Sequence, residues 1–219
     1  MSYRIVTIDG PAGAGKTTVS KALAEALGCV YVDTGALYRG AAYEIDRLDV
    51  DWKNQEDLQV FLDALDLTFV IEGRELTLTS SGRDITPYIR TPEISMLASA
   101  TSAQNAVRRA LLGIQKRIAA TRDAVFEGRD MGTAVFPDAP FKFFLFADIE
   151  IRARRRHDEM NGPDKELEKI KSDMSKRDKD DASRKASPLT PAQDAVLVDS
   201  THMTVAQVVE TMRAHIEKS

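Results

Sequence analysis

A glycine-rich octet near the start of the chain has the composition and spacing of a phosphate-binding loop. Residues 10–17 read Gly-Pro-Ala-Gly-Ala-Gly-Lys-Thr and fit the pattern G-x-x-x-x-G-K-[ST]. Glycines let backbone N–H groups turn towards phosphate oxygens, and the N-terminus of a following helix favours an anion. We therefore predict that Lys16 neutralises the β- and γ-phosphates of a nucleoside triphosphate and that the Thr17 hydroxyl is a ligand of Mg²⁺. The predicted nucleotide-binding residues are Gly10, Ala12, Gly13, Ala14, Gly15, Lys16, Thr17 and Thr18.

The hydrophobic pattern around this octet predicts the strand–turn–helix that such a loop needs. An apolar run at residues 3–8 precedes it, and an alanine-rich stretch with helical periodicity follows at residues 17–27. Further short strands are expected at 29–32, 124–126, 143–146 and 195–198, and helices at 35–48, 108–121, 149–160 and 205–216. Five strands that alternate with helices indicate an α/β fold with a five-stranded parallel sheet flanked by helices, as in P-loop NTPases.

Two segments that are more polar than the surrounding core interrupt this alternation. We expect both to be insertions within a single domain spanning 1–219. The first, at about 36–102, contains β-rich runs at 67–71 and 75–79 joined by Glu-Gly-Arg, which predicts a hairpin and hence a small β-sheet. The second, at about 152–186, is dense in both basic and acidic residues, as is typical of a solvated helical lid.

The composition of the chain argues against some classes of binding partner. The formal charge of −4 over 219 residues argues against a general nucleic-acid coat or a protein that binds anionic membranes. Cys29 is the single cysteine, so no intrachain disulfide can form, and the sequence has neither a signal-peptide pattern nor an apolar run of membrane-spanning length. We expect a cytoplasmic monomer whose partners are small-molecule nucleotides, with no nucleic acid and no membrane.

Polar residues follow two other predicted strands. Asp-Thr-Gly-Ala-Leu-Tyr-Arg at 33–39 follows the second, and ligands in open α/β sheets bind at the carboxyl ends of strands. The competing interpretation is an N-capping Asp33 or Thr34 with a solvent-facing Arg39. The third strand runs into Glu-Gly-Arg-Asp-Met-Gly-Thr, where Arg129 could hold a phosphate and Asp130 could accept hydrogen bonds from an amino group. A purely structural Arg–Asp pair is the alternative there.

The octet alone does not separate a kinase from a GTPase switch. The chain contains neither D-x-x-G nor N-K-x-D, which argues against a GTPase. The motifs together resemble bacterial-type cytidylate kinases, which are nucleoside monophosphate kinases among the P-loop kinases. The resemblance runs along the whole chain, through the octet and residues 33–39, 90–108, 128–137 and 177–189, and the runs at 128–133 and 33–36 are its most specific parts.

The resemblance implies transfer of the γ-phosphoryl group of ATP to CMP or dCMP, with Mg²⁺, and it implies a role for each matching residue. Ser99, Arg108 and Asp130 match the positions at which the family recognises the cytosine base. In the positions that hold the acceptor phosphate are Arg39 and Arg129, with Thr34 near both base and phosphate. Arg177 and Asp181 match sugar-contacting or lid positions, and Arg184 matches a residue facing the transferring phosphates. The catalytic set implied is Lys16, Arg129, Arg177 and Arg184.

Two other functions stay open on the sequence. One is a P-loop kinase for another acceptor, such as AMP, UMP or a hydroxyl compound, and the other is a noncatalytic nucleotide-binding switch. A kinase that phosphorylates a phosphate needs no strong general base, because a monophosphate ester has a second pKa near about 6 and is mostly dianionic at neutral pH. A hydroxyl acceptor would instead require an aspartate beside its attacking oxygen.

Overall fold

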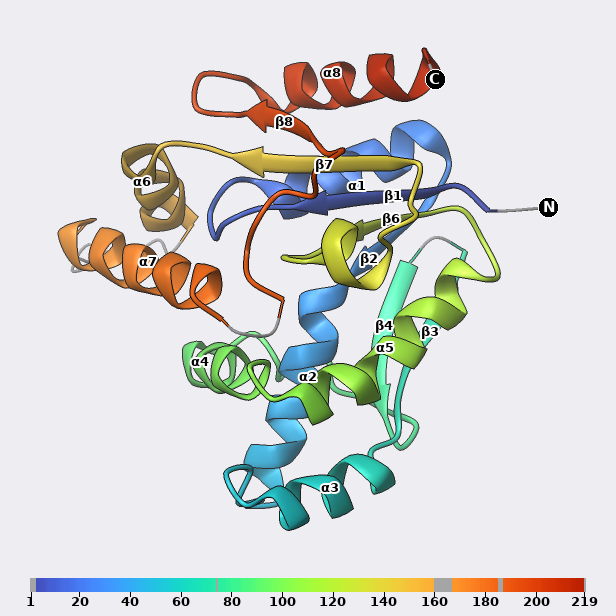
Figure 1. The fold of residues 1–219 in the computed structure, drawn as a ribbon, viewed down its shortest axis with the longest axis vertical. Coiled ribbons are helices and arrows are strands. Elements are labelled where there is room, and N and C mark those ends of the chain that lie inside the picture. The colour runs from blue at the N-terminus through green and yellow to red at the C-terminus, as the bar shows by residue number, and fades with distance from the viewer. Residues whose placement is uncertain (1–2, 74, 160–166, 185–186, 219) are drawn as a thin grey trace.

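The computed structural model describes residues 3–73, 75–159, 167–184 and 187–218. Its centre is an all-parallel sheet of five strands in the order β2-β6-β1-β7-β8 (Figure 1). The strands are β1 Ile5–Asp9, β2 Val30–Asp33, β6 Ala124–Glu127, β7 Phe141–Phe146 and β8 Val196–Asp199. The predicted α/β architecture is confirmed, with strand boundaries displaced by up to two residues from those expected.

Helices cover both faces of this sheet. On one face, α1 Lys16–Leu27 and α8 Val205–Glu217 bury an apolar core against the strands. Members of this core include Val6, Ile8, Val19, Leu23, Val125, Phe143, Leu145, Val208 and Met212. On the other face, α5 Asn105–Ala119 and the π-helix η1 Met131–Val135 pack over Ile5, Val32 and Phe126. The apolar strands therefore contact helices on both sides, which is why they read as continuous hydrophobic runs.

A second body extends below the sheet in Figure 1. It comprises α2 Thr34–Arg47, α3 Gln55–Ala64, β3 Leu67–Glu72, β4 Glu75–Ser80, β5 Arg83–Asp84 and α4 Pro92–Thr101. The three strands form the small antiparallel sheet that the sequence predicted. Its core joins Leu37, Leu58, Leu78 and Ile85 to Leu111 of α5, so α5 packs on both bodies.

The charge-rich segment forms two helices, α6 Ile149–Glu159 and α7 Leu167–Ala182, which pack against each other around Ala153, Ile170 and Met174. In Figure 1 they lie on the side to which the arrowheads of β1 and β7 point, next to α4. Residues 160–166 and 185–186 of the predicted lid lie outside the described residues. Among the helices that the structure describes, none has the length and apolar content needed to cross a membrane.

Candidate active site

The glycine-rich loop joins β1 to α1 in a backbone path that glycine makes accessible. Gly10, Gly13 and Gly15 have φ angles of 147°, 72° and 88°. A Cβ atom on Gly10 would lie 1.9 Å from the carbonyl oxygen of Leu145 on β7, so no larger residue fits there. Gly15 precedes α1 without a side-chain cap, which leaves the N–H groups of the first helical turn directed to this loop. The loop and helix together form a phosphate-binding cradle.

Lys16 lies beneath this loop and is buried. Its Nζ donates to the carbonyl oxygen of Pro11 over 2.7 Å. Burial and the nearby Arg129 guanidinium lower the pKa of Lys16 to about 7, against the opposing effect of Glu127. The ammonium group is therefore short of negative partners, and a phosphate group would supply them.

Glu127, at the carboxyl end of β6, faces Thr17 of the loop. Its Oε1 accepts from the Thr17 hydroxyl over 3.0 Å, and its Oε2 accepts from the Tyr31 hydroxyl over 2.6 Å. Both donors are neutral, and within the described residues Glu127 forms no ion pair. A buried carboxylate that forms no direct ion pair among the described residues, beside a hydroxyl in a phosphate-binding loop, is an oxygen donor set that suits Mg²⁺. The sequence assigned the metal to Thr17 and missed Glu127, although an acidic residue at the end of a buried strand was a usable signal.

Asp9, at the end of β1, fixes the segment that follows β6. Its two oxygens accept from the backbone N–H groups of Met131 (2.9 Å) and Gly132 (2.8 Å). Burial raises the pKa of Asp9 to about 6, and these two hydrogen bonds oppose that rise. Arg129 and Asp130 directly precede this anchor, so a residue that the sequence analysis did not single out positions both.

Asp33 is the N-cap of α2 and also pairs with Arg39, so the predicted N-cap is present but Arg39 does not face solvent as that interpretation supposed. It caps α2 by accepting from the N–H of Ala36 over 3.1 Å, and its Oδ2 also accepts from Arg39 (2.7 Å) and Arg90 (3.3 Å). Arg39 therefore points along the helix towards the strand ends and is only partly exposed. The Thr34 hydroxyl is buried and donates to the carbonyl oxygen of Glu127 over 2.6 Å.

Asp130 pairs with Arg108 of α5, and both side chains are largely buried. The Arg108 guanidinium lies over the ring of Tyr38, 5.6 Å from its centre. Ser99 faces the lid: its hydroxyl and carbonyl oxygens accept from Arg184 over 3.2 and 3.4 Å. The structure thus brings Arg108 and Asp130 into direct contact, whereas Ser99, on α4, contacts Arg184.

An arginine cluster lies between the loop and the Arg108–Asp130 pair. Arg129 Nε donates to Asp181 Oδ2 over 3.2 Å, and Arg184 forms an ion pair with the other oxygen of Asp181. Loss of hydration, followed by the charge of Arg129, lowers the pKa of Arg177 to about 10, and Arg39 and Arg184 act in the same direction. With a pKa of about 10, Arg177 stays charged at neutral pH. These four guanidinium groups are paired with two carboxylates, Asp33 and Asp181, and the excess of positive charge is the electrostatic character of an anion site.

A sequence model of the cytidylate kinase family matches residues 6–218. The chain belongs to the cytidylate kinase family. It is 41% identical to the cytidylate kinase of Citrifermentans bemidjiense over 216 residues, which is 98% of this chain and 93% of that protein. It is 43% identical to that of Pseudomonas aeruginosa over 220 residues, covering 98% and 95%. The resemblance inferred from the motifs is confirmed, and with it the assignment to a kinase family of phosphotransferases.

A solved shikimate kinase from Bacteroides thetaiotaomicron shares the fold with this cytidylate kinase family member. The two superpose with a TM-score of 0.52 and 14% identity over 98% of each chain. At that identity the likeness concerns the P-loop kinase fold alone. The individual roles of the site residues in this family member stay predictions.

The lid helices of this family member contact the phosphate-binding loop through Arg152, which the sequence placed in the lid without a role. Its Nη1 donates to the carbonyl oxygen of Ala12 (3.0 Å) and to Asp178 (2.6 Å). Arg155, on the same helix, contacts the loop indirectly. It donates to the Ser200 hydroxyl, which in turn donates to the carbonyl oxygen of Ala14 over 3.1 Å. Thr18, predicted to bind nucleotide, is exposed on α1 and takes part in none of these contacts.

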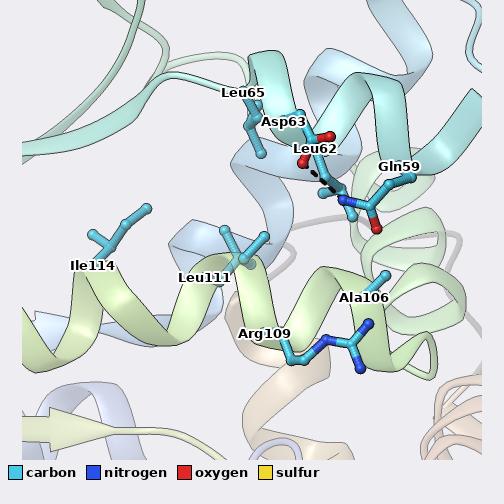
Figure 2. A pocket seen from close by; sticks show the side chains of 9 residues that line it. Gln59, Leu62, Asp63, Leu65, Ala106, Arg109, Leu111 and Ile114 are labelled. Carbon is cyan, nitrogen blue, oxygen red and sulfur yellow. Dashed lines mark hydrogen bonds between the residues drawn. The ribbon is translucent and has the colours of Figure 1, made fainter.

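A cavity of about 350 Å³ lies between α3 and α5, away from this arrangement (Figure 2). Leu62, Leu111 and Ile114 line its apolar side, while Asp63 and Arg109 contribute charges. It shares no residue with the glycine-rich loop or the arginine cluster. None of the site residues predicted from the sequence lines this cavity.

Proposed function

We propose that the protein transfers the γ-phosphoryl group of ATP to CMP or dCMP and so forms ADP and CDP or dCDP. The observation that carries this proposal is the placement of the arginine cluster between a phosphate-binding loop and the buried Arg108–Asp130 pair. One end of the site suits a triphosphate, the other suits a nucleobase, and the positive charge lies where two phosphates would meet.

On the donor side, Lys16 and the first-turn N–H groups of α1 hold the phosphates of ATP. Thr17 and Glu127 would hold Mg²⁺ there. When bound, Mg²⁺ neutralises charge on the phosphate oxygens. Lys16 regains its proton against those oxygens, because the negative charge of a phosphate offsets the burial that lowers the pKa of Lys16.

On the acceptor side, Arg39 and Arg129 hold the monophosphate, and Asp130 selects the base. A carboxylate only accepts hydrogen bonds, so it pairs with the exocyclic amino group of cytosine and repels the carbonyl oxygen that uracil carries in its place. Arg108 forms an ion pair with Asp130 and orients its carboxylate. Ser99 and Thr34 complete the contacts to the nucleotide, and Asp181 and Arg177 contact its sugar or close the lid.

Catalysis then consists of positioning and charge neutralisation. The acceptor phosphate is already nucleophilic as a dianion, so no residue has to remove a proton from it. Lys16, Arg129, Arg177 and Arg184 balance the charge of the transferring group. The lid helices exclude water, which would otherwise accept the phosphoryl group in place of CMP.

This function, together with the composition, supports a monomer acting in the cytoplasm on nucleotides. Residues 36–102 would form the monophosphate-binding insertion and 152–186 the lid. The test of the function is ADP formation in a coupled assay with ATP, Mg²⁺ and a panel of CMP, dCMP, UMP, AMP and hydroxyl acceptors. We expect CMP and dCMP to be the best acceptors. A different best acceptor would indicate another P-loop kinase, and no turnover with any acceptor would indicate a nucleotide-binding switch.

A further inference from the structure

Tyr31 lies on the edge strand β2, and its hydroxyl contacts the Glu127 carboxylate on β6. In the parallel register Tyr31 pairs with Val125 and Asp33 with Glu127, so Tyr31 and Glu127 extend from the same face of the sheet. We propose that Tyr31 is a positioning residue that orients Glu127 towards Thr17 and the Mg²⁺ that accompanies ATP. This rests on the kinase function proposed above and extends it to a residue outside the phosphate-binding loop.

The hydrogen bonds of Glu127 divide its two oxygens between two tasks. Oε2 accepts from Tyr31 over 2.6 Å, which leaves Oε1 directed to the Thr17 hydroxyl at 3.0 Å. A buried carboxylate oxygen that loses its donor must rotate to find another or bear the cost of an unmade hydrogen bond. A carboxylate oxygen can only accept a hydrogen bond, so at 2.6 Å the Tyr31 hydroxyl is the donor to Glu127.

The Tyr31 ring is held in place independently of its hydroxyl. It packs against the apolar core beneath α1, and Lys21 Nζ lies 5.6 Å from the ring centre. Lys21 and Thr17 are four residues apart on α1, so they lie on the same side of that helix. Removing the hydroxyl alone should therefore leave the ring where it is and release only Glu127.

The test compares Tyr31→Phe with Tyr43→Phe. Tyr43 provides a matched control because its hydroxyl also contacts a charged side chain, accepting from Arg83 over 3.1 Å, in the second body. The first measurement is the binding of Mn²⁺ to the enzyme–ADP complex by electron paramagnetic resonance, which needs no turnover. We expect Tyr31→Phe to weaken Mn²⁺ binding by about three- to tenfold and Tyr43→Phe to leave it unchanged. The Mg²⁺ concentration for half-maximal turnover should rise by a similar factor, while the KM for CMP stays constant.

A double-mutant cycle with Glu127→Gln separates positioning from a general structural effect. If Tyr31 acts through the Glu127 carboxylate, Tyr31→Phe will have little further effect on Mn²⁺ binding in the Glu127→Gln background. An equal effect in both backgrounds, or unchanged Mn²⁺ binding in Tyr31→Phe, overturns the proposal. Thermal unfolding of each variant shows whether the fold is retained, and a destabilised Tyr31→Phe would be replaced by Tyr31→Met, which also has no hydrogen-bond donor in its side chain.

The outcome for Tyr31 is distinguishable from that for the kinase function. Mn²⁺ binding to the ADP complex reports on Tyr31 even if CMP proves not to be the acceptor. Conversely, a wild-type enzyme that phosphorylates CMP while Tyr31→Phe binds Mn²⁺ normally would overturn only the role of Tyr31.

Discussion

Arg129, which follows β6, donates from Nε to Oδ2 of Asp181 on α7 over 3.2 Å, and this contact joins the central sheet to the lid. Asp181 is 2% exposed and also pairs with Arg184. One carboxylate therefore holds two of the guanidinium groups assigned to phosphate binding. It holds them side by side, which is the arrangement that two groups sharing one phosphate would need.

Replacement of Asp181 by asparagine is expected to disorganise this site. The amide has nearly the same shape but no charge, so Arg129 and Arg184 repel each other without compensation. We expect kcat/KM for CMP to fall by about 10- to 100-fold, with a smaller change in the KM for ATP. Asp180→Asn is the matched control, because Asp180 is its exposed neighbour on the same helix. Steady-state kinetics at varied CMP and ATP measure both; similar losses in the two variants would contradict the role of Asp181.

The central fold and the donor loop were predictable because their signals are local. The strand at Ile5–Asp9, the glycines at 10–15 and the helix from Lys16 follow one another in sequence, and each carries its own pattern. The short helices α3 and α4 were not predicted, although Asn54 and Thr91 cap them and Pro92 opens α4. Their apolar faces are short, so the helical period is weak.

The partners within the site could not be predicted, because they depend on contacts between distant segments. The sequence singled out Arg129 and Asp130 as neighbours that might pair with each other. In the structure each has a distant partner, Asp181 for Arg129 and Arg108 for Asp130. Residues 128–130 form a bend after β6, and the two neighbouring side chains leave it towards different elements. Likewise Tyr31 meets Glu127 only because β2 and β6 are neighbours in the sheet.

Asp130→Asn tests how the base is selected. The amide can donate a hydrogen bond where the carboxylate only accepts, which removes the repulsion of the uracil carbonyl. We expect the preference for CMP over UMP, as a ratio of kcat/KM values, to fall by at least about tenfold while the KM for ATP changes little. Asp138→Asn, an exposed aspartate beyond η1, is the control. A preserved CMP preference in Asp130→Asn would show that another group reads the amino position.

Binding of ATP should be coupled to proton uptake at Lys16. The pKa of Lys16 is lowered to about 7 in the free protein, so at pH 8 its amine is largely neutral. Phosphate oxygens restore the ammonium form, so binding takes up a proton above pH 7 and the uptake disappears as pH falls below that pKa. Isothermal titration calorimetry at pH 8 in two buffers of different ionisation enthalpy measures the number of protons taken up for each ATP bound. Lys16→Arg, always charged, should show no uptake; equal uptake in both proteins would assign the proton to another group.

Comparing the stability of Gly10→Ala with that of Gly82→Ala separates two costs of replacing a glycine, namely backbone strain and a steric clash of the new Cβ atom. Both glycines have positive φ, but a Cβ atom on Gly82 meets nothing within 4 Å, whereas one on Gly10 lies 1.9 Å from a backbone oxygen of β7. Gly82→Ala therefore bears only the cost of left-handed backbone, about 1–2 kcal/mol, or a few degrees in Tm. Gly10→Ala must also displace a central strand, so we expect a loss of more than about 4 kcal/mol, or no soluble protein. Urea and thermal unfolding followed by circular dichroism measure both variants. Equal losses of stability in the two variants would mean that β7 can move at Leu145 at little cost. The close contact between the loop and the sheet would then not be the reason for a glycine at position 10.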